Sequence, residues 1–384
     1  MELMKKIILS LTLLLIPAFV YAEEVDLAPN AKAAIIVEAS TGTILYQKNI
    51  HEKLPPASMT KMMGMLLVVE SVEKGQINWD DIVIVSENAS SMGGSQILLE
   101  TGEKMTVDDL FKGVAVASGN DAIVALGEKI AGTEEMFVKM MNDRAKELGL
   151  KNTNFKNPHG LEEANHYTSA YDISKIALEL VKHPKVLEYT GIYEDYLRKG
   201  TNREFWLVNT NKLVRFNQNV DGLKTGYTKE AGYCLTATAS KDGMRLITVV
   251  FGEPESSTRN KETTGMLDYG FSMYSVEKLL SKDLKVGTIK IYASDKETYE
   301  IVPMKDVNIL NNKTQEKRNV TYEINTKTLS APIKKGEVVG KLKIIENNKT
   351  IDEIDITVKN DVKKANIFKL YLRNIKNIIT GNTL

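Results

Sequence analysis

Residues 55 to 63 read P-P-A-S-M-T-K-M-M, so a hydroxyl and an amine stand three residues apart. If a helix begins near Ala57, as the two prolines indicate, Ser58 and Lys61 share one face of its first turns. A serine hydroxyl needs a base to act as a nucleophile. A lysine with an ordinary pKa of about 10.4 is protonated at neutral pH and cannot be that base. The pair therefore predicts a nucleophile only if burial and a second cation lower the pKa of Lys61.

Two later segments could complete such a site. In A-S-G-N-D, Ser118 could pass on a proton and Asn120 could bind a peptide group, although the segment alone fits a helix-capping turn. In D-G-L-K-T-G-Y, Lys224 supplies a cation and Thr225 a hydroxyl, while Gly226 lets a ligand approach the strand backbone. That segment alone fits an exposed turn. Only the three segments together, in this order, indicate a catalytic site.

The elements around these segments predict an α/β fold of the α+β type. Alternating apolar runs predict one hairpin at 33–48 and a second one around Lys241-Asp242-Gly243. Apolar periodicity and capping residues predict helices over residues 57–74, 106–116, 121–131, 134–148, 172–181 and 264–274. Strands at both ends with helices between them predict an antiparallel sheet flanked by helices, with a helical insert.

The chain is expected to divide into four parts. Residues 1–22 carry Lys5 and Lys6, a short apolar run and a small residue at Ala22, which predicts a cleaved signal peptide; an uncleaved anchor is the alternative. Residues 23–280 are the predicted catalytic domain. Residues 283–360 alternate short apolar runs with polar turns and predict a small all-β domain, a β-sandwich.

The last part, residues 363–384, predicts an amphipathic helix. Its apolar side carries Ile367, Phe368, Tyr371, Ile375, Ile378 and Ile379, and its opposite side carries Lys369, Arg373 and Lys376. This pattern fits a helix that lies in a membrane interface with anionic lipid, and the segment is too short and charged to cross a bilayer. A helix docked on its own protein is the alternative.

Composition narrows the remaining possibilities. The formal net charge is zero, so the chain has no overall electrostatic signature for nucleic acid. The four histidines, His51, His159, His166 and His183, show no metal-ligand spacing, and one cysteine cannot build a thiolate site. We expect neither metal nor cofactor. Cys234 lies in an apolar run and is predicted to be a buried, inert thiol.

The S-x-x-K, S-x-N and K-T-G segments resemble the set found in penicillin-binding proteins and class A β-lactamases. The chain as a whole resembles a low-molecular-mass penicillin-binding protein, a serine-type D-alanyl-D-alanine carboxypeptidase of peptidase family S11. The resemblance covers nearly the whole chain, including the export signal, the β domain and the tail. It is carried by S-E-N-A-S-S-M-G-G-S-Q, G-E-K-M-T-V-D-D-L, V-A-S-G-N-D-A, N-P-H-G-L and D-G-L-K-T-G-Y-T.

The resemblance implies a reaction at the end of a cell-wall stem peptide. Ser58 would attack the carbonyl between the two terminal D-alanines, and Lys61 would take its proton. Ser118 would relay a proton to the leaving amine, and Asn120 would bind a substrate amide. Water would then hydrolyse the acyl-enzyme. His159 is expected to be structural, despite its N-P-H-G setting.

The resemblance also implies how the substrate is held. Lys224 would keep Lys61 deprotonated by repulsion and, with Thr225, attract the terminal carboxylate. The backbone N–H groups of Ser58 and Tyr227 would form an oxyanion hole, and Gly226 would admit the substrate. Tyr227 stands where family members often have histidine, so only its backbone role carries over.

Arg259, which we expect in a loop, aligns with an arginine that helps to hold the carboxylate. The expected partners are stem peptides of peptidoglycan that end in D-Ala-D-Ala, and β-lactam antibiotics as covalent inhibitors. The expected location is the outer face of the cytoplasmic membrane, with peripheral anchoring by the C-terminal helix.

Three alternatives remain at this point. A β-lactamase runs the same acylation, but class A enzymes carry S-D-N and a glutamate-bearing loop, whereas Gly119 stands at the middle position here. A non-catalytic wall-binding protein could keep the fold alone. Transpeptidation would use the same acyl-enzyme, and the sequence separates it poorly from hydrolysis.

Overall fold

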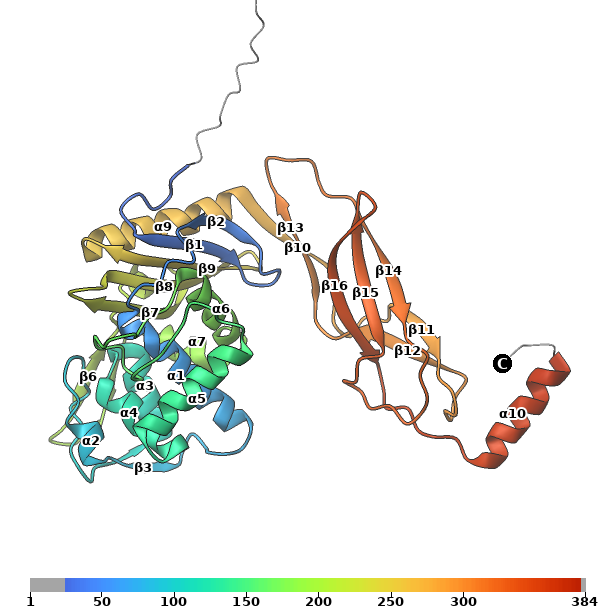
Figure 1. Cartoon of the computed structure of the whole chain (residues 1–384), viewed down its shortest axis with the longest axis horizontal. Coiled ribbons are helices and arrows are strands. Elements are labelled where there is room, and N and C mark those ends of the chain that lie inside the picture. The colour runs from blue at the N-terminus through green and yellow to red at the C-terminus, as the bar shows by residue number, and fades with distance from the viewer. Residues whose placement is uncertain (1–24, 381–384) are drawn as a thin grey trace, which may run out of the picture.

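A five-stranded antiparallel sheet forms the centre of the first part of the molecule, in the order β2-β1-β9-β8-β7 (Figure 1). The computed structural model describes residues 25–380, so the predicted signal peptide lies outside the described residues. The strands of this sheet are β1 (Ala33–Glu38), β2 (Ile44–Lys48), β7 (Val220–Thr228), β8 (Gly232–Lys241) and β9 (Met244–Glu253). Both predicted hairpins are present, and the K-T-G segment lies in β7, at one edge of the sheet.

The sheet is buried on both faces, and β1 shows why. Side chains alternate along a strand, so neighbouring residues face opposite sides. Ile35 and Val37 belong to the core on the side of the helical part, whereas Ala34 and Ile36 belong to the core on the side of α9 (Ser256–Met273). Figure 1 shows α9 along one face and the helices labelled α1 to α7 beyond the opposite face.

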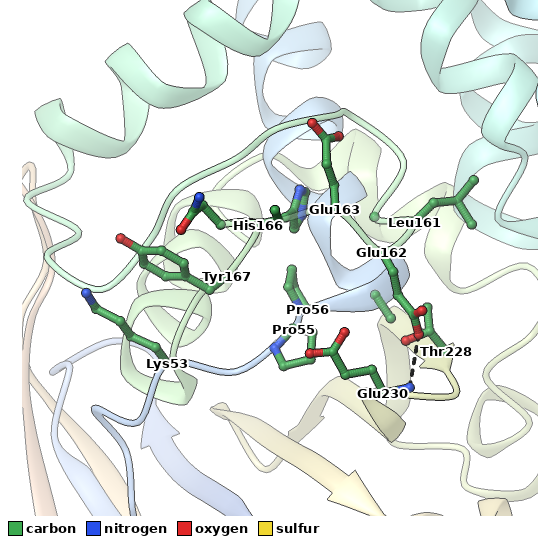
Figure 2. A pocket seen from close by; sticks show the side chains of 14 residues that line it. Lys53, Pro55, Pro56, Leu161, Glu162, Glu163, His166, Tyr167, Thr228 and Glu230 are labelled. Atoms are coloured by element: carbon green, nitrogen blue, oxygen red, sulfur yellow. Dashed lines mark hydrogen bonds between the residues drawn. The ribbon is translucent and has the colours of Figure 1, made fainter.

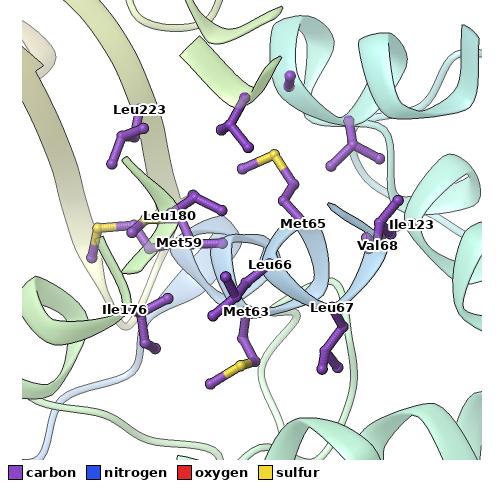
Figure 3. Close-up of a cluster of buried hydrophobic side chains, with 14 of the residues drawn as sticks. Met59, Met63, Met65, Leu66, Leu67, Val68, Ile123, Ile176, Leu180 and Leu223 are labelled. Atoms are coloured by element: carbon purple, nitrogen blue, oxygen red, sulfur yellow. The ribbon is translucent and has the colours of Figure 1, made fainter. Parts of the chain in front are cut away.

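The helical part surrounds one apolar helix. That helix, α1 (Lys61–Glu73), follows the short 3-10 helix η1 (Ala57–Thr60), and methionine, leucine and valine side chains pack around it (Figure 3). The other helices of this part are α2 (Glu87–Ser90), α3 (Val107–Ala117), α4 (Asn120–Ala131), α5 (Glu134–Glu147), α6 (Ala170–Leu180), α7 (Pro184–Thr190) and α8 (Leu213–Phe216). Two small hairpins accompany them, β3 (Ile82–Ile84) with β4 (Lys104–Thr106) and β5 (Glu194–Leu197) with β6 (Phe205–Val208).

The prediction for α9 was wrong at its start and for Arg259. The sequence predicted a helix over 264–274 with Arg259 in a loop, but the helix begins at Ser256 and includes Arg259. Its buried face consists of Arg259, Glu262, Thr263, Met266, Leu267 and Gly270. These positions have helical spacing, but half of them are polar, so apolar periodicity detects only the second half of the helix.

Strands dominate the second part of the molecule, which stands beside the first (Figure 1). A two-stranded sheet pairs β10 (Tyr274–Leu280) with β13 (Val307–Asn312). A five-stranded sheet follows the order β11-β12-β16-β15-β14. Its strands are β11 (Gly287–Lys290), β12 (Thr298–Pro303), β14 (Val320–Thr326), β15 (Gly340–Glu346) and β16 (Lys349–Val358). These strands enclose a separate apolar core, which includes Ile301, Leu342 and Ile356.

The C-terminal helix α10 (Ile367–Thr380) presents its apolar side chains to solvent. Ile367 is 87% exposed, and Ile378 and Ile379 are 77% exposed. On the other side of the helix, the Arg373 guanidinium donates hydrogen bonds to the carbonyls of Ser294 and Lys296. The helix therefore contacts its own protein through a basic residue rather than through its apolar face. None of the helices between residues 25 and 380 has the length and apolar character needed to cross a bilayer.

Candidate active site

The hydroxyl of Ser58 and the amine of Lys61 lie in contact. Lys61 Nζ is 2.9 Å from Ser58 Oγ. The predicted helix begins as a 3-10 turn that contains Ser58, and Lys61 is the first residue of α1. Side chains three residues apart eclipse one another in a 3-10 turn, which explains the close approach. The spacing in S-x-x-K thus brings the two groups together.

Two glycines hold the backbone in front of Ser58. Ala57 has a φ of +46°, an unusual value for a residue with a side chain, and it is buried. A Cβ at Gly160 would lie 1.9 Å from the Ala57 carbonyl oxygen. A Cβ at Gly226 would lie 2.9 Å from the Pro56 carbonyl oxygen and 3.3 Å from the Ser58 nitrogen. The N-P-H-G loop and β7 therefore meet at Ala57, and only glycine permits this packing.

Lys61 has surroundings that suit a base. Burial lowers the pKa of Lys61 well below its ordinary value, and the positive charge of Lys224 lowers it further, while Asp121 acts in the opposite direction. The side chain is fully buried. Nζ also donates a hydrogen bond of 2.7 Å to the His159 carbonyl oxygen. A neutral amine can keep this bond and use its lone pair to accept the Ser58 proton.

Lys224 is the second cation that a base at Lys61 requires, and the surroundings of Lys224 determine its own pKa. Burial lowers the pKa of Lys224 to about 7, and repulsion from Arg259 contributes. Its ammonium donates to the carbonyl of Thr225 at 3.1 Å. For Lys61 itself, burial is a larger cause of the low pKa than repulsion by Lys224. An approaching carboxylate would favour the charged form of Lys224.

Ser118 and Asn120 lie where α3 ends and α4 begins. Ser118 ends α3 in the left-handed conformation, with a φ of 65°, and Asn120 is the first residue of α4. The segment is therefore a junction between two helices, as a helix-capping turn would be. Asn120 Nδ2 donates a hydrogen bond of 2.6 Å to the Gly93 carbonyl, so Oδ1 is the side-chain atom that remains available to a substrate. Ser118 Oγ and Asn120 Oδ1 are both buried and have no hydrogen-bond partner among the described residues.

Thr225 lies close to the end of α3. Its hydroxyl donates a hydrogen bond of 2.8 Å to Thr210 Oγ1, and the Thr210 N–H donates a hydrogen bond to the carbonyl of Val116. This bridge links β7 to the turn that carries Ser118. Tyr227 follows on β7 with its ring 56% exposed, and the ring stacks on that of Tyr233 at a centroid distance of 4.4 Å.

Arg259 is less open than its expected role suggests. The side chain is only 5% exposed, and its Nε and one terminal nitrogen donate to Asn260 Oδ1. Burial lowers the pKa of Arg259, while Cys234, Tyr233 and Glu253 act in the opposite direction. Arg259 acts electrostatically on Lys224, so it belongs to the same charged group. Cys234 itself is buried, and burial raises the pKa of its thiol to about 12.

The sequence prediction missed the chemical part that the N-P-H-G loop plays. His159 was expected to be structural, yet its carbonyl accepts the Lys61 hydrogen bond. The loop is held by Asn157, whose Oδ1 accepts from the Gly160 N–H at 2.7 Å. Burial lowers the pKa of the His159 ring to about 4, so the ring is neutral near neutral pH. Every residue carries a backbone carbonyl, so the sequence does not show which carbonyl accepts from Lys61. The N-P-H-G motif was the only feature of the sequence that pointed to this loop.

A cavity of about 510 Å³ lies beside Pro56 and Ala57, on the outer side of the same loop (Figure 2). The side chains of Glu162, Glu163 and Glu230 line it together with Lys53. Ser58, Lys61 and Lys224 are not part of its wall. The reacting groups therefore lie outside this cavity.

Comparison with known proteins agrees with this geometry. The family model described as D-alanyl-D-alanine carboxypeptidase matches residues 20–255, and the model described as penicillin-binding protein 5, C-terminal domain, matches residues 274–364. The chain belongs to the D-alanyl-D-alanine carboxypeptidase family. The predicted family and its serine-type carboxypeptidase activity are thereby confirmed.

Two curated relatives carry the carboxypeptidase name. D-alanyl-D-alanine carboxypeptidase DacF of Bacillus subtilis is 49% identical over 351 residues, which cover 91% of this chain and 90% of that protein. D-alanyl-D-alanine carboxypeptidase DacA of Haemophilus influenzae is 35% identical over 88% of this chain and 87% of its own length. Members of the family therefore match along nearly the whole chain.

Solved structures confirm the predicted fold class, with its C-terminal all-β domain. Penicillin-binding protein 5 from Haemophilus influenzae is 34% identical, with a TM-score of 0.72 over 87% of this chain and 98% of that one. Penicillin-binding protein D2 from Listeria monocytogenes, in an ampicillin-bound form, is 32% identical, with a TM-score of 0.57 over 63% of this chain and 98% of that one. The fold of the carboxypeptidase family thus extends to both parts of the molecule.

Proposed function

We propose that this carboxypeptidase removes the terminal D-alanine from peptidoglycan stem pentapeptides through an acyl-Ser58 intermediate. The observation that carries the proposal is the buried amine of Lys61, 2.9 Å from Ser58 Oγ, with its pKa held well below the ordinary range. A base in hydrogen-bond reach of a hydroxyl, and neutral at working pH, is what nucleophilic catalysis by serine requires.

In the first step Ser58 Oγ forms a bond to the carbonyl carbon of the penultimate D-alanine, and its proton passes to Lys61 Nζ. The bond to the terminal D-alanine nitrogen then breaks, and the proton on Lys61 passes to this nitrogen through Ser118, whose Oγ is buried and unpartnered, so that Lys61 is neutral again. In the second step water attacks the carbonyl carbon of the resulting ester while Lys61 takes a proton from it. The bond from the carbonyl carbon to Ser58 Oγ then breaks, and Lys61 returns the proton to Oγ, so that Lys61 acts as the base in both steps.

The same arrangement offers groups to hold the substrate. Oδ1 of Asn120 is a free acceptor, so we assign it to a substrate N–H rather than to a carbonyl. Lys224 and Thr225 would attract the terminal carboxylate, with Arg259 adding positive charge behind them. The Ser58 and Tyr227 N–H groups would stabilise the tetrahedral oxyanion, for which such donors are typically worth about 3 kcal/mol each.

We further propose that β-lactams acylate Ser58. The ampicillin-bound form of penicillin-binding protein D2 from Listeria monocytogenes, a structural neighbour, supports this assignment. The carboxypeptidase names of the relatives favour hydrolysis of D-Ala-D-Ala over the β-lactamase alternative and over a non-catalytic wall-binding protein. Transpeptidation is the second candidate, because a neighbour from Streptomyces K15, 28% identical with a TM-score of 0.60, is described as a DD-transpeptidase.

The decisive experiment measures release of D-alanine from a pentapeptide together with the intact mass after treatment with penicillin. The wild-type chain should release D-alanine and gain the mass of one penicillin. The Ser58→Ala variant should do neither. Absence of both from the wild type, or an adduct that persists in Ser58→Ala, contradicts the proposal. Adding an amine acceptor to the same assay distinguishes transpeptidation, which would yield a larger peptide instead of free acid.

We propose that residues 1–22 direct export and that the mature enzyme works at the outer face of the cytoplasmic membrane. Residues 23–280 would form the catalytic domain and residues 283–360 the β domain, although β10, at the end of the first range, pairs with β13 of the second. The exposed apolar side of α10, within residues 363–384, supports peripheral attachment to an anionic membrane surface.

A further inference from the structure

Asp121 follows Asn120 in the sequence and is buried in the first turn of α4, with 1% exposure. Its carboxylate accepts hydrogen bonds from three backbone N–H groups. The Ile97 N–H lies 3.1 Å from both oxygens, the Leu99 N–H lies 3.0 Å from Oδ2, and the Ala122 N–H lies 2.8 Å from Oδ1. Every partner is a donor, which matches a carboxylate, an acceptor-only group.

These bonds tie down residues 93–99, which we call the rim segment. Asn120 holds the other end of the same segment: its N–H donates 2.7 Å to the Ser95 carbonyl, and Nδ2 donates 2.6 Å to the Gly93 carbonyl. Gly94 permits this approach, because a Cβ there would lie 2.8 Å from Asn120 Nδ2. Two neighbouring residues, Asn120 and Asp121, therefore grip the rim segment along most of its length.

Asp121 also acts on the base. Its negative charge raises the pKa of Lys61, against burial and Lys224, which lower it. The charged or titratable groups around this pair lie on several elements. Lys224 of β7 and the His159 ring interact electrostatically with Lys61. Beside the rim segment lie Arg198, Arg203 and Glu103, where both arginines donate to its carbonyls and pair with Glu103.

We propose that Asp121 is a positioning residue of the active site. Its carboxylate holds the rim segment in place beside Asn120, and its negative charge near Lys61 opposes the effect of the positive charge of Lys224. The inference rests on the proposed function of Lys61. It assigns a role to the residue after S-x-N, which touches neither substrate nor Ser58. The rim segment orients Asn120, and the charge of Asp121 moderates how readily Lys61 loses its proton.

The test compares two buried aspartates. Asp172 is also 1% exposed and lies in the first turn of α6, as Asp121 lies in the first turn of α4. Its carboxylate accepts from the Asn152 N–H at 2.7 Å and from the Thr153 hydroxyl at 2.8 Å. Asp172 is not among the groups that shift the pKa of Lys61, whereas Asp121 is. Asp121→Asn and Asp172→Asn each remove one carboxylate from a hydrogen-bonded site, but only the first one changes the charge near the base.

The measurement is the second-order rate of acylation by penicillin in the full chain, followed by intact mass from acidic to alkaline pH. Asp121→Asn should move the acidic limb of the profile to lower pH, because loss of the negative charge lowers the pKa of Lys61 further. Its plateau should fall about tenfold, because the new amide faces the Leu99 N–H and loosens the rim segment. Asp172→Asn should leave the limb in place.

An unmoved limb in Asp121→Asn, or an equal movement in both variants, overturns the proposal. Asp121→Glu keeps the charge and should keep the wild-type limb, even where its plateau falls. If Asp121→Asn does not fold, Asp121→Ser is measured in the same way, since its hydroxyl can still accept one N–H. Failure of the wild type to be acylated would instead contradict the proposed function itself.

Discussion

Lys61 and Lys224 are among the largest fully buried side chains of the protein, and neither has an ion-pair partner among the described residues. Burial of an ammonium without a carboxylate is unfavourable, so each group moves towards its neutral form. The consequence differs between them. Lys61 is held where a neutral amine can take the Ser58 proton, whereas Lys224, with a pKa of about 7, can regain its charge beside a substrate carboxylate.

Because the burial of Lys61 is unfavourable, replacing this residue should stabilise the protein and reduce its activity. Lys61→Met keeps the shape of the side chain and removes the amine. We expect the free energy of unfolding to rise by about 1 kcal/mol, because active-site groups are commonly retained at a cost in stability. Acylation by penicillin should fall at least about 10³-fold for lack of a base. Denaturant unfolding and intact mass measure the two effects.

The matched control is Lys74→Met, at the exposed C-terminal end of the same helix. It should change neither quantity appreciably, because a surface substitution usually shifts stability by less than about 0.5 kcal/mol. A Lys61→Met variant that is less stable than the wild type would mean that the amine is favourably paired.

The pH profile should respond to Lys224. Because its charge lowers the pKa of Lys61, Lys224→Ala should raise that pKa. Lys61 would then be protonated over a wider range, and the acidic limb of acylation should move to higher pH. This direction is opposite to the one expected for Asp121→Asn. Lys224→Arg keeps a cation and should leave the limb near its wild-type position, even if binding of the carboxylate weakens. A limb that moves to lower pH in Lys224→Ala contradicts this electrostatic account.

At the scale of elements, the site is assembled where four pieces of chain meet: the 3-10 turn η1, the edge strand β7, the α3–α4 junction and the N-P-H-G loop. The hydroxyl of Ser58 comes from the first, Lys224 from the second, and the acceptor for Lys61 from the last. Close contact between backbones, through Gly160 and Gly226 at Ala57, keeps these pieces in register.

That contact predicts a sharp effect at Gly160. A methyl group there would overlap the Ala57 carbonyl oxygen, at a distance of 1.9 Å, so Gly160→Ala must displace the turn that carries Ser58. Gly132→Ala is the matched control, because Gly132 has a similar positive φ, +85° against +88°, but no neighbour within 4 Å. Both variants incur the backbone strain of about 1–2 kcal/mol for alanine in this region.

We expect Gly160→Ala to lose at least about 2 kcal/mol more than the control in denaturant unfolding, since a steric clash is added to the strain. Its acylation rate should fall as well, whereas that of Gly132→Ala should not. Equal stabilities of Gly160→Ala and Gly132→Ala would show that the loop accommodates the methyl group with no additional loss of stability.

At the scale of the whole molecule, neither the core of the β domain nor the C-terminal helix α10 contributes a residue to the candidate active site. Ile301, Leu342 and Ile356 belong to a core that shares no residue with the two cores around the first sheet. Beyond them, α10 offers an apolar side to solvent while Arg373 holds its opposite side to the β domain. A surface of this kind on a helix that is too short and polar to span a bilayer suits an interface.

Deletion of residues 365–384 should therefore abolish binding to liposomes and leave acylation by penicillin unchanged. The double variant Ile378→Glu with Ile379→Glu removes only the apolar contact, since both side chains are 77% exposed and free to enter a membrane. It should behave like the deletion in a co-sedimentation assay. Replacing Arg373 by Gln should have a smaller effect, because its guanidinium is already engaged with the protein. Undiminished binding after the deletion would show that another surface meets the membrane.

The sequence by itself determined the reactive pair, both sheet hairpins and most helices, because each depends on local spacing. S-x-x-K places its two side chains on one face of a single turn, and Thr106 caps α3 with an acceptor for the Asp109 N–H, as the capping pattern predicts. The three motifs also identified the family before any contact was known.

Only the tertiary structure decided what depends on contacts between distant segments. Arg259 belongs to a helix whose first buried residues are polar, so local apolar periodicity could not detect it. The acceptor of Lys61 is a backbone carbonyl, which every residue carries, and Asp121 meets a segment more than twenty residues away in the chain. Burial is a property of the assembled core, and burial is the largest cause of the low pKa of Lys61.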